Sequence, residues 1–242
     1  MSAIYKRELK AYFTSPIGYT ILIIFYFFSG WFFSDLFEQG VPDLSAVFDS
    51  MFIFVLIIAP LLTMRLFSED KRQKTDQLLL TAPVRLISVV LGKLFAAITV
   101  YATAMGIMVV YQMIISSVMP EGASVDWMVF IGYLLGMFLF GFALIALGLF
   151  ISALTESQVV SAVCTLGLSF GFSLLSTLAN QIPESNWFYN TARESLLWLS
   201  FSERYAGFTT GVLNYGDIFF FVSIGMIFVV LTIAVLDRKR YA

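Results

Sequence analysis

Six long apolar blocks limit what this chain can fold into more than any other feature of its sequence. Each can cross a bilayer, because about 20 apolar residues at about 1.5 Å per residue match a hydrocarbon core of about 30 Å. Lipid offers no partner for an open strand edge, so the blocks are expected to be helices. The predicted fold class is all-α: a single polytopic integral membrane domain, residues 1–242, with six transmembrane helices. Their approximate cores are residues 17–34, 50–66, 87–118, 128–153, 158–180 and 218–236.

The composition excludes several kinds of catalytic site. The chain is 60% hydrophobic and only 12% charged, whereas soluble domains carry about 25% charged residues. It has no His, which excludes His-ligated zinc and Ser-His-Asp triads. It also has no G-x-x-x-x-G-K-[ST] loop for nucleotide phosphates. We therefore expect no enzyme activity and no cofactor or metal bound by this chain.

Basic residues gather on one side of the predicted membrane. Of the 14 Lys and Arg residues, all but Arg193 and Arg204 fall before the first block, around the second connection or after the last block. Cytoplasmic loops are enriched in Lys and Arg, and six helices bring both termini to the same side. The predicted location is the inner (cytoplasmic) membrane, with multiple passes and both termini in the cytoplasm.

The first 16 residues are predicted to form a separate amphipathic helix. Apolar and basic side chains fall on opposite helical faces, and Ser15-Pro16 is expected to end the helix. We interpret it as an interfacial helix on the inner leaflet; the alternative is a basic flank that only orients the first span. The apolar face comprises Ile4, Tyr5, Leu9, Tyr12 and Phe13, and the basic face Lys6, Arg7 and Lys10.

The longest charged interruption is RLFSEDKRQKTDQLLLTAPVR, residues 65–85. Ser68 is a suitable N-cap, acidic residues follow it in the first turn, and Pro83 marks a stop. These features predict a cytosolic helix of about three turns within residues 67–86, with a polar first half and an apolar leucine run. Its functional interpretation is a coupling helix that docks on another protein. The alternative is an ordinary loop whose basic residues set the orientation.

Three parts of the sequence resemble ABC transporter permeases of the type-two exporter class. The first is Arg65 to Arg72 with Thr75 and the run Leu78 to Val84, and the second is Lys6-Arg7-Glu8-Leu9 through Ser15-Pro16. The third runs from Leu199 to Asp217, and together they resemble most the gliding-motility-type subgroup. Lys74 departs from the pattern, since many members have Gly there, and so does Gln77, where many have Glu.

The resemblance implies a permease subunit of an ATP-driven exporter that couples ATP hydrolysis in a separate subunit to substrate movement. Implied partners are two copies of an ABC ATP-binding subunit that hold ATP and Mg²⁺, a second permease subunit (identical or homologous) and membrane lipid, without nucleic acid. Reversing Glu69 and Asp70 to Lys is expected to uncouple hydrolysis from transport without preventing insertion. The implied ATPase-coupling residues are Arg65, Ser68, Glu69, Asp70, Lys71, Arg72, Lys74, Thr75, Asp76, Leu78, Leu79, Leu80 and Pro83.

The fifth block carries small hydroxyl residues at every fourth position. Such a stripe forms a slanted ridge on a helix, and small residues allow helices to approach closely in lipid. Two interpretations stay open: helix packing within the chain, or the lining of a substrate path or subunit seam. The stripe comprises Ser157, Ser161, Thr165, Ser169, Ser173 and Thr177. G-x-x-x-G pairs occur at Gly132 and Gly136 in the fourth block and at Gly167 and Gly171 in the fifth.

The outer connection, residues 181–217, is too long for a simple turn. Thr191 and Glu194 have capping-box spacing, so one or two short re-entrant or interfacial helices are expected before the sixth span. Its aromatic side chains suit a headgroup-level anchor, and the resemblance implies an outer gate. The candidate gate residues are Trp187, Trp198 and Tyr205.

Two other functional classes are also compatible with six apolar spans. An ion-coupled secondary transporter or channel commonly places a charged residue near the membrane midplane. The six apolar cores contain no such residue away from their ends, which favours an energy source outside the bilayer. A membrane scaffold without transport activity is the remaining alternative.

Overall fold

The structure is a computed structural model that describes residues 1–41, 43–75, 85–118, 126–182, 187–209 and 214–241. In these ranges every regular element is a helix, and six helices are long and apolar enough to cross a membrane. This confirms the six predicted spans. They are α2 (Pro16–Glu38), α3 (Ser45–Thr63), α6 (Leu86–Val118), α7 (Trp127–Leu154), α8 (Gln158–Asn180) and α11 (Tyr215–Tyr241).

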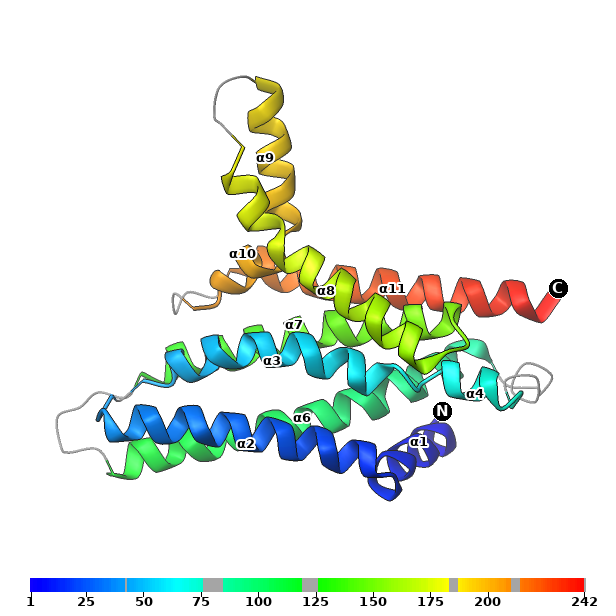
Figure 1. Cartoon of the computed structure of the whole chain (residues 1–242), viewed down its shortest axis with the longest axis horizontal. Coiled ribbons are helices and arrows are strands. Elements are labelled where there is room, and N and C mark those ends of the chain that lie inside the picture. The colour runs from blue at the N-terminus through cyan, green and yellow to red at the C-terminus, as the bar shows by residue number, and fades with distance from the viewer. Residues whose placement is uncertain (42, 76–84, 119–125, 183–186, 210–213, 242) are drawn as a thin grey trace.

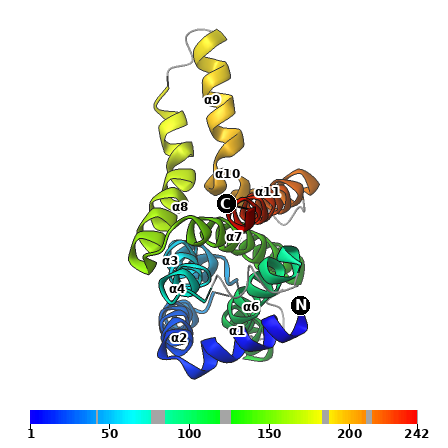
Figure 2. The same cartoon turned by 90° about the vertical axis from the view of Figure 1, so that its right-hand side faces the viewer.

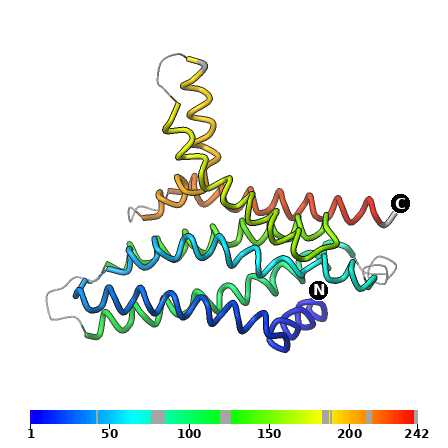
Figure 3. The backbone as a smooth tube through the Cα atoms, viewed as in Figure 1, coloured from blue at the N-terminus to red at the C-terminus, as the bar shows by residue number. Residues whose placement is uncertain are grey.

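The bundle runs along the length of the molecule and holds α2, α3, α6, α7 and α11 side by side (Figure 1). Both chain termini lie at one end of this bundle, together with the short helix α4 (Ser68–Arg72). We call this the terminus end and the opposite end the far end. The course of the backbone in Figure 3 shows α8 crossing the bundle at a slant. Its last turns pair with α9 (Trp187–Leu199) in a helical hairpin that stands away from the other spans (Figures 1 and 2).

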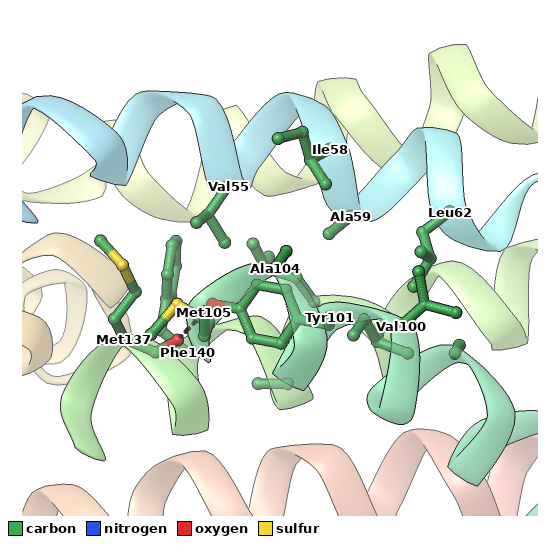
Figure 4. Close-up of a cluster of buried hydrophobic side chains, with 14 of the residues drawn as sticks. Val55, Ile58, Ala59, Leu62, Val100, Tyr101, Ala104, Met105, Met137 and Phe140 are labelled. Carbon is green, nitrogen blue, oxygen red and sulfur yellow. Dashed lines mark hydrogen bonds between the residues drawn. The ribbon is translucent and has the colours of Figure 1, made fainter. Parts of the chain in front are cut away.

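Three helices supply most of the buried core. Over the most apolar 18 residues of each span, 56% are buried in Ser45–Arg72, which contains α3, 50% in α6 and 61% in α7, against 22% to 28% in α2, α8 and α11. Figure 4 shows Val55 and Ala59 of α3 above Tyr101 of α6, with Phe140 of α7 alongside. The Tyr101 hydroxyl donates to the carbonyl of Met137 at 2.7 Å, so the buried polar group is satisfied across α6 and α7.

Local sequence signals set several helix ends. Pro16 opens α2, where its missing N–H costs no hydrogen bond. Asp126 caps α7 by accepting from the Met128 amide at 2.9 Å. The predicted capping box at Thr191 is wrong, because Thr191 lies inside α9 and its hydroxyl donates to the carbonyl of Trp187. The N-cap signal instead operates at Ser200, which opens α10 (Phe201–Ala206) and accepts from the amide three residues on.

The N-terminal helix α1 (Ser2–Thr14) ends at Ser15 as predicted. Its apolar face is turned toward α6 and α2 of the same chain. The Tyr12 side chain is buried, and its hydroxyl donates to the Leu62 carbonyl at 2.6 Å. Burial raises the pKa of the Tyr12 phenol, which therefore stays a neutral donor. Gly92 allows the close approach, since a Cβ there would lie 3.1 Å from the Ile4 side chain.

Candidate coupling site

The start of α4 is held by a serine from another span. The backbone amides of Phe67 and Ser68 donate to the Ser152 hydroxyl of α7 at 2.9 and 3.1 Å. The prediction that Ser68 is the N-cap is wrong: Phe67 holds that position, and the buried Ser68 hydroxyl donates to the carbonyl of Met64. Because Ser152 accepts from both amides, the first turn of α4 is capped by a side chain of a different helix of the same chain.

The end of α4 comes after five residues, so the prediction of one continuous helix of about three turns is wrong. The Lys74 amide donates to the carbonyl of Lys71, and the Thr75 amide to that of Asp70. This is the Schellman arrangement, which requires a left-handed residue, and Lys74 has a φ of 57°. Asp76, Leu78, Leu79, Leu80 and Pro83, the rest of the predicted rod, lie outside the described residues.

Lys71 attaches α4 to the end of α7. Its ammonium donates to the carbonyl of Ala153 and, at 3.4 Å, to that of Thr155. Ala153 lies in the last turn of α7 and Thr155 is its C-cap residue; at this end the helix leaves acceptors unpaired and its dipole favours a cation. Lys71 is 9% exposed, so it faces the bundle and not the solvent. It therefore anchors α4 to α7.

Asp70 attaches α4 to two further helices through Lys93. The Lys93 ammonium lies 2.8 Å from the Asp70 carboxylate and 3.0 Å from the Glu8 carboxylate of α1. It also donates to the carbonyl of Leu66 at 2.5 Å. Lys93 comes from α6 and is 1% exposed. We call Ser152, Lys71, Asp70, Lys93 and Glu8 the anchor network.

Arg65 and Glu69 form a second link beside the anchor network. The Arg65 guanidinium lies 3.3 Å from the Glu69 carboxylate and donates to the Ser15 hydroxyl at 2.7 Å. It also sits over the Tyr12 ring, 5.3 Å from its centroid. The connection between the second span and α4 is thus tied to the last turn of α1 and to Ser15, the residue between α1 and α2.

One part of α4 remains open to solvent. Arg72, Gln73 and Lys74 are exposed, and we call them the α4 tip. Thr75 is half-buried, and its hydroxyl lies 3.2 Å from the Asp70 carbonyl oxygen. Among the described coupling residues, the structure therefore separates anchors that face the bundle from a basic tip that faces away.

The hydroxyl stripe of α8 faces the bundle along its middle. Ser161, Thr165 and Ser169 are fully buried, and Ser173 is 9% exposed. The helix packs against α3 and α7 on this side. Gly148 of α7 allows a close contact with α8, because a Cβ at that position would lie 3.1 Å from the Thr165 methyl group. Ser157 and Thr177 are exposed at the two ends of the stripe. The middle of the stripe thus packs within the chain, and its role at a seam or path stays a prediction.

The two G-x-x-x-G pairs have different surroundings. In α7, a Cβ at Gly132 or Gly136 would lie 2.8 or 2.7 Å from atoms of Phe208, so this pair admits the segment that follows α10. In α8, Gly167 and Gly171 have no other residue within 4 Å of a Cβ position. The α7 pair is therefore an intrachain packing site, whereas the α8 pair faces outward.

The three candidate gate residues do not converge in the structure. Trp187 and Trp198 are 81% and 62% exposed on the α9 hairpin. Tyr205 of α10 is buried, with its ring 5.0 Å from that of Phe52 and 6.1 Å from that of Phe140. Burial raises the pKa of the Tyr205 phenol well above its usual value, so this side chain is neutral.

Sequence reasoning missed an ion pair at the far end of the bundle. The Arg204 guanidinium of α10 donates to the Asp217 carboxylate of α11 at 2.9 Å and to the Trp198 carbonyl at 3.1 Å. Asp217 is 4% exposed. The pair joins the end of α9, α10 and the start of α11. The available signal was Arg204, which with Arg193 is one of two basic residues in the outer connection.

Six apolar spans, with a short charged helix docked at one end of the bundle, define a polytopic membrane protein. The family described as ABC-2 family transporter protein matches residues 2–240, and the chain belongs to that family. It is therefore the permease component of an ABC transporter, and the family implies an ATP-binding partner subunit. A comparison with curated proteins gives no significant match.

Proposed function

We propose that this chain is the permease of an ATP-driven exporter and that α4 receives the movement of the ATP-binding subunit. The observation that carries the proposal is the division of α4 into two sides. Its anchors bind the ends of α6 and α7, while Arg72, Gln73 and Lys74 face away from the bundle. A protein that pushes on the tip would therefore push on two core spans at once.

The proposal extends to the assembly and its location. The terminus end lies in the cytoplasm of a cell whose inner membrane holds the six spans, consistent with the basic residues at that end. Two ATP-binding subunits bind ATP and Mg²⁺, and a second permease, identical or homologous, completes the membrane part. The α8–α9 hairpin supports this last point, because exposed apolar residues such as Leu174 and Leu178 cover it. The segment of α9 and α10 is proposed as the outer gate, with Tyr205 reaching into the bundle.

The chief alternative is an ion-coupled transporter that needs no ATPase. Within the long helices that the structure describes, Lys93 and Asp217 are the buried charges, and each is paired with a charge of opposite sign. Lys93 lies in the first third of α6, and Asp217 is the third residue of α11. These positions suit structural ion pairs near helix ends better than a titrating group at the midplane.

The experiment compares two charge reversals at the same end of the molecule. The variant Arg72→Glu with Lys74→Glu changes the α4 tip, while Lys6→Glu with Lys10→Glu makes the same charge change on the exposed face of α1. A surface of the partner that binds a basic tip is expected to be acidic, so the tip variant would bring like charges together, which cost several kcal/mol across an interface. We therefore expect the tip variant to bind the ATP-binding subunit at least about tenfold more weakly. Binding is measured by co-purification of an ATP-hydrolysing protein from membranes. Equal loss in both variants, or in neither, would contradict the assignment of the tip.

A further inference from the structure

Lys93 is a buried lysine that touches three separate segments of the chain. Its ammonium contacts Glu8 of α1, Asp70 of α4 and the carbonyl of Leu66, at 3.0, 2.8 and 2.5 Å. It also lies over the Phe67 ring, 5.2 Å from the centroid. The sequence places Lys93 only among the basic residues that flank the membrane. The structure makes it the point where α1, α4 and α6 meet.

A buried lysine needs an explanation other than stability. Replacing a buried ion pair by packed apolar residues is often neutral or stabilising, whereas removing one partner leaves an uncompensated charge. In some proteins such a group instead defines the geometry, because the ammonium is satisfied only when its partners stand in fixed places. Here the two carboxylates come from different helices, so Lys93 fixes the position of α1 relative to α4.

Other contacts hold α1 against the same region. The Tyr12 hydroxyl donates to the Leu62 carbonyl, and Arg65 binds the Ser15 hydroxyl. These bonds attach the end of α1 to the end of α3, while Glu8 attaches its middle to α4 through Lys93. The helix is therefore held at two levels along its length.

We propose that Lys93 is a positioning residue that makes α1 and α4 move together when the ATP-binding subunit acts on α4. The proposal rests on the function proposed above and states how the movement is distributed. Force applied at the α4 tip reaches α6 directly and draws α1 along through Glu8. The N-terminal helix is then part of the moving unit and not a passive flank.

The test follows distances between spin labels in the complex of this chain with its ATP-hydrolysing partner. The exposed Cys164 is first replaced by Ser. One label pair, at positions 10 and 73, spans α1 and the α4 tip; the other, at positions 38 and 73, spans the far end of α2 and the tip. Both are measured without nucleotide and with Mg-ATP and vanadate. We expect the second distance to shift by about 2 Å or more, the scale of helix movements at interfaces, while the first stays constant.

Three variants then separate positioning from general stability. Lys93→Met removes the charge and keeps an unbranched side chain that is one atom shorter. The distribution of distances between α1 and the tip should then broaden, and its mean should shift with nucleotide. Glu8→Gln is milder and should act in the same direction. Arg7→Gln is the matched control, because Arg7 pairs with the same carboxylate at 2.7 Å from a side chain that is 53% exposed. This control should behave as the native chain.

The outcomes distinguish this proposal from the proposed function. If the distance from α2 to the tip is the same with and without nucleotide, the proposed function is contradicted. A complex in which that distance responds, but α1 separates from the tip in the native chain, overturns only the role of Lys93. The role is also overturned when both Lys93→Met and Glu8→Gln leave the distance from α1 to the tip unchanged by nucleotide.

Discussion

Replacing Lys74 by Gly should make α4 more stable. Lys74 ends the helix with a φ of 57°, and a left-handed conformation costs an L-residue about 1–2 kcal/mol. Glycine avoids this cost but has more freedom in the unfolded chain, which offsets about 0.4–1 kcal/mol of the gain. The net stabilisation is about 1 kcal/mol, or about fivefold in the opening equilibrium of the segment.

Hydrogen exchange of the purified chain measures this change without the ATP-binding subunit. The peptides that cover α4 and the Thr75 amide report its local opening, because exchange of a bonded amide requires the bond to break. Lys74→Ala is the matched control: it removes the same charge but keeps a Cβ. We expect about fivefold slower exchange in the Gly variant than in the Ala variant.

Equal exchange in the two variants would refute the reasoning. It would mean either that residue 74 does not need the left-handed conformation or that the end of α4 opens without breaking the bonds of the Schellman arrangement. Slower exchange in the Ala variant would refute it more strongly, because a continuous helix through position 74 would favour Ala over Gly.

Two further changes test the anchor network and the core. Ser152→Ala removes the acceptor for two buried amides and should cost about 0.5–2 kcal/mol, seen as a lower thermal unfolding temperature; Ser116→Ala, which changes an exposed hydroxyl, should leave that temperature unchanged. Gly141→Ala drives a Cβ into the Tyr101 ring and should cost about 1–3 kcal/mol. Gly167→Ala meets open space and should stabilise α8 by up to about 1 kcal/mol. Equal unfolding temperatures for the two glycine variants would contradict the close packing of Gly141 against Tyr101 and the open surroundings of Gly167.

Features that depend on residues close together along the chain could be predicted from the sequence. The lengths of the apolar blocks predicted the spans, and Pro16 marked the junction of α1 and α2. The early end of α4 also left a signal, since the resemblance places Lys74 at a position where many members have Gly. The prediction of a longer rod failed because the apolar leucine run suggested continuity through that position.

The anchor network could not be predicted because its bonds join residues far apart in the chain. Ser152 accepts from an amide 85 residues away, and Lys93 binds a carboxylate 85 residues away. No local pattern indicates that a serine near the end of one span will cap a helix after another. For the same reason, Lys93 resembled an ordinary flanking residue until α1 and α4 were placed beside it.

The structure changes what a charge reversal in α4 can test. Reversing Glu69 and Asp70 places one new cation beside Arg65, now 3.3 Å from Glu69, and another beside the buried Lys93. Two buried or half-buried like-charge contacts would loosen α4 from α6 and disturb its fold. Lost transport in that variant could therefore follow from a detached α4 as readily as from a lost ATPase contact. Reversals at the exposed tip leave the anchors intact, so they separate binding of the partner from the integrity of the permease.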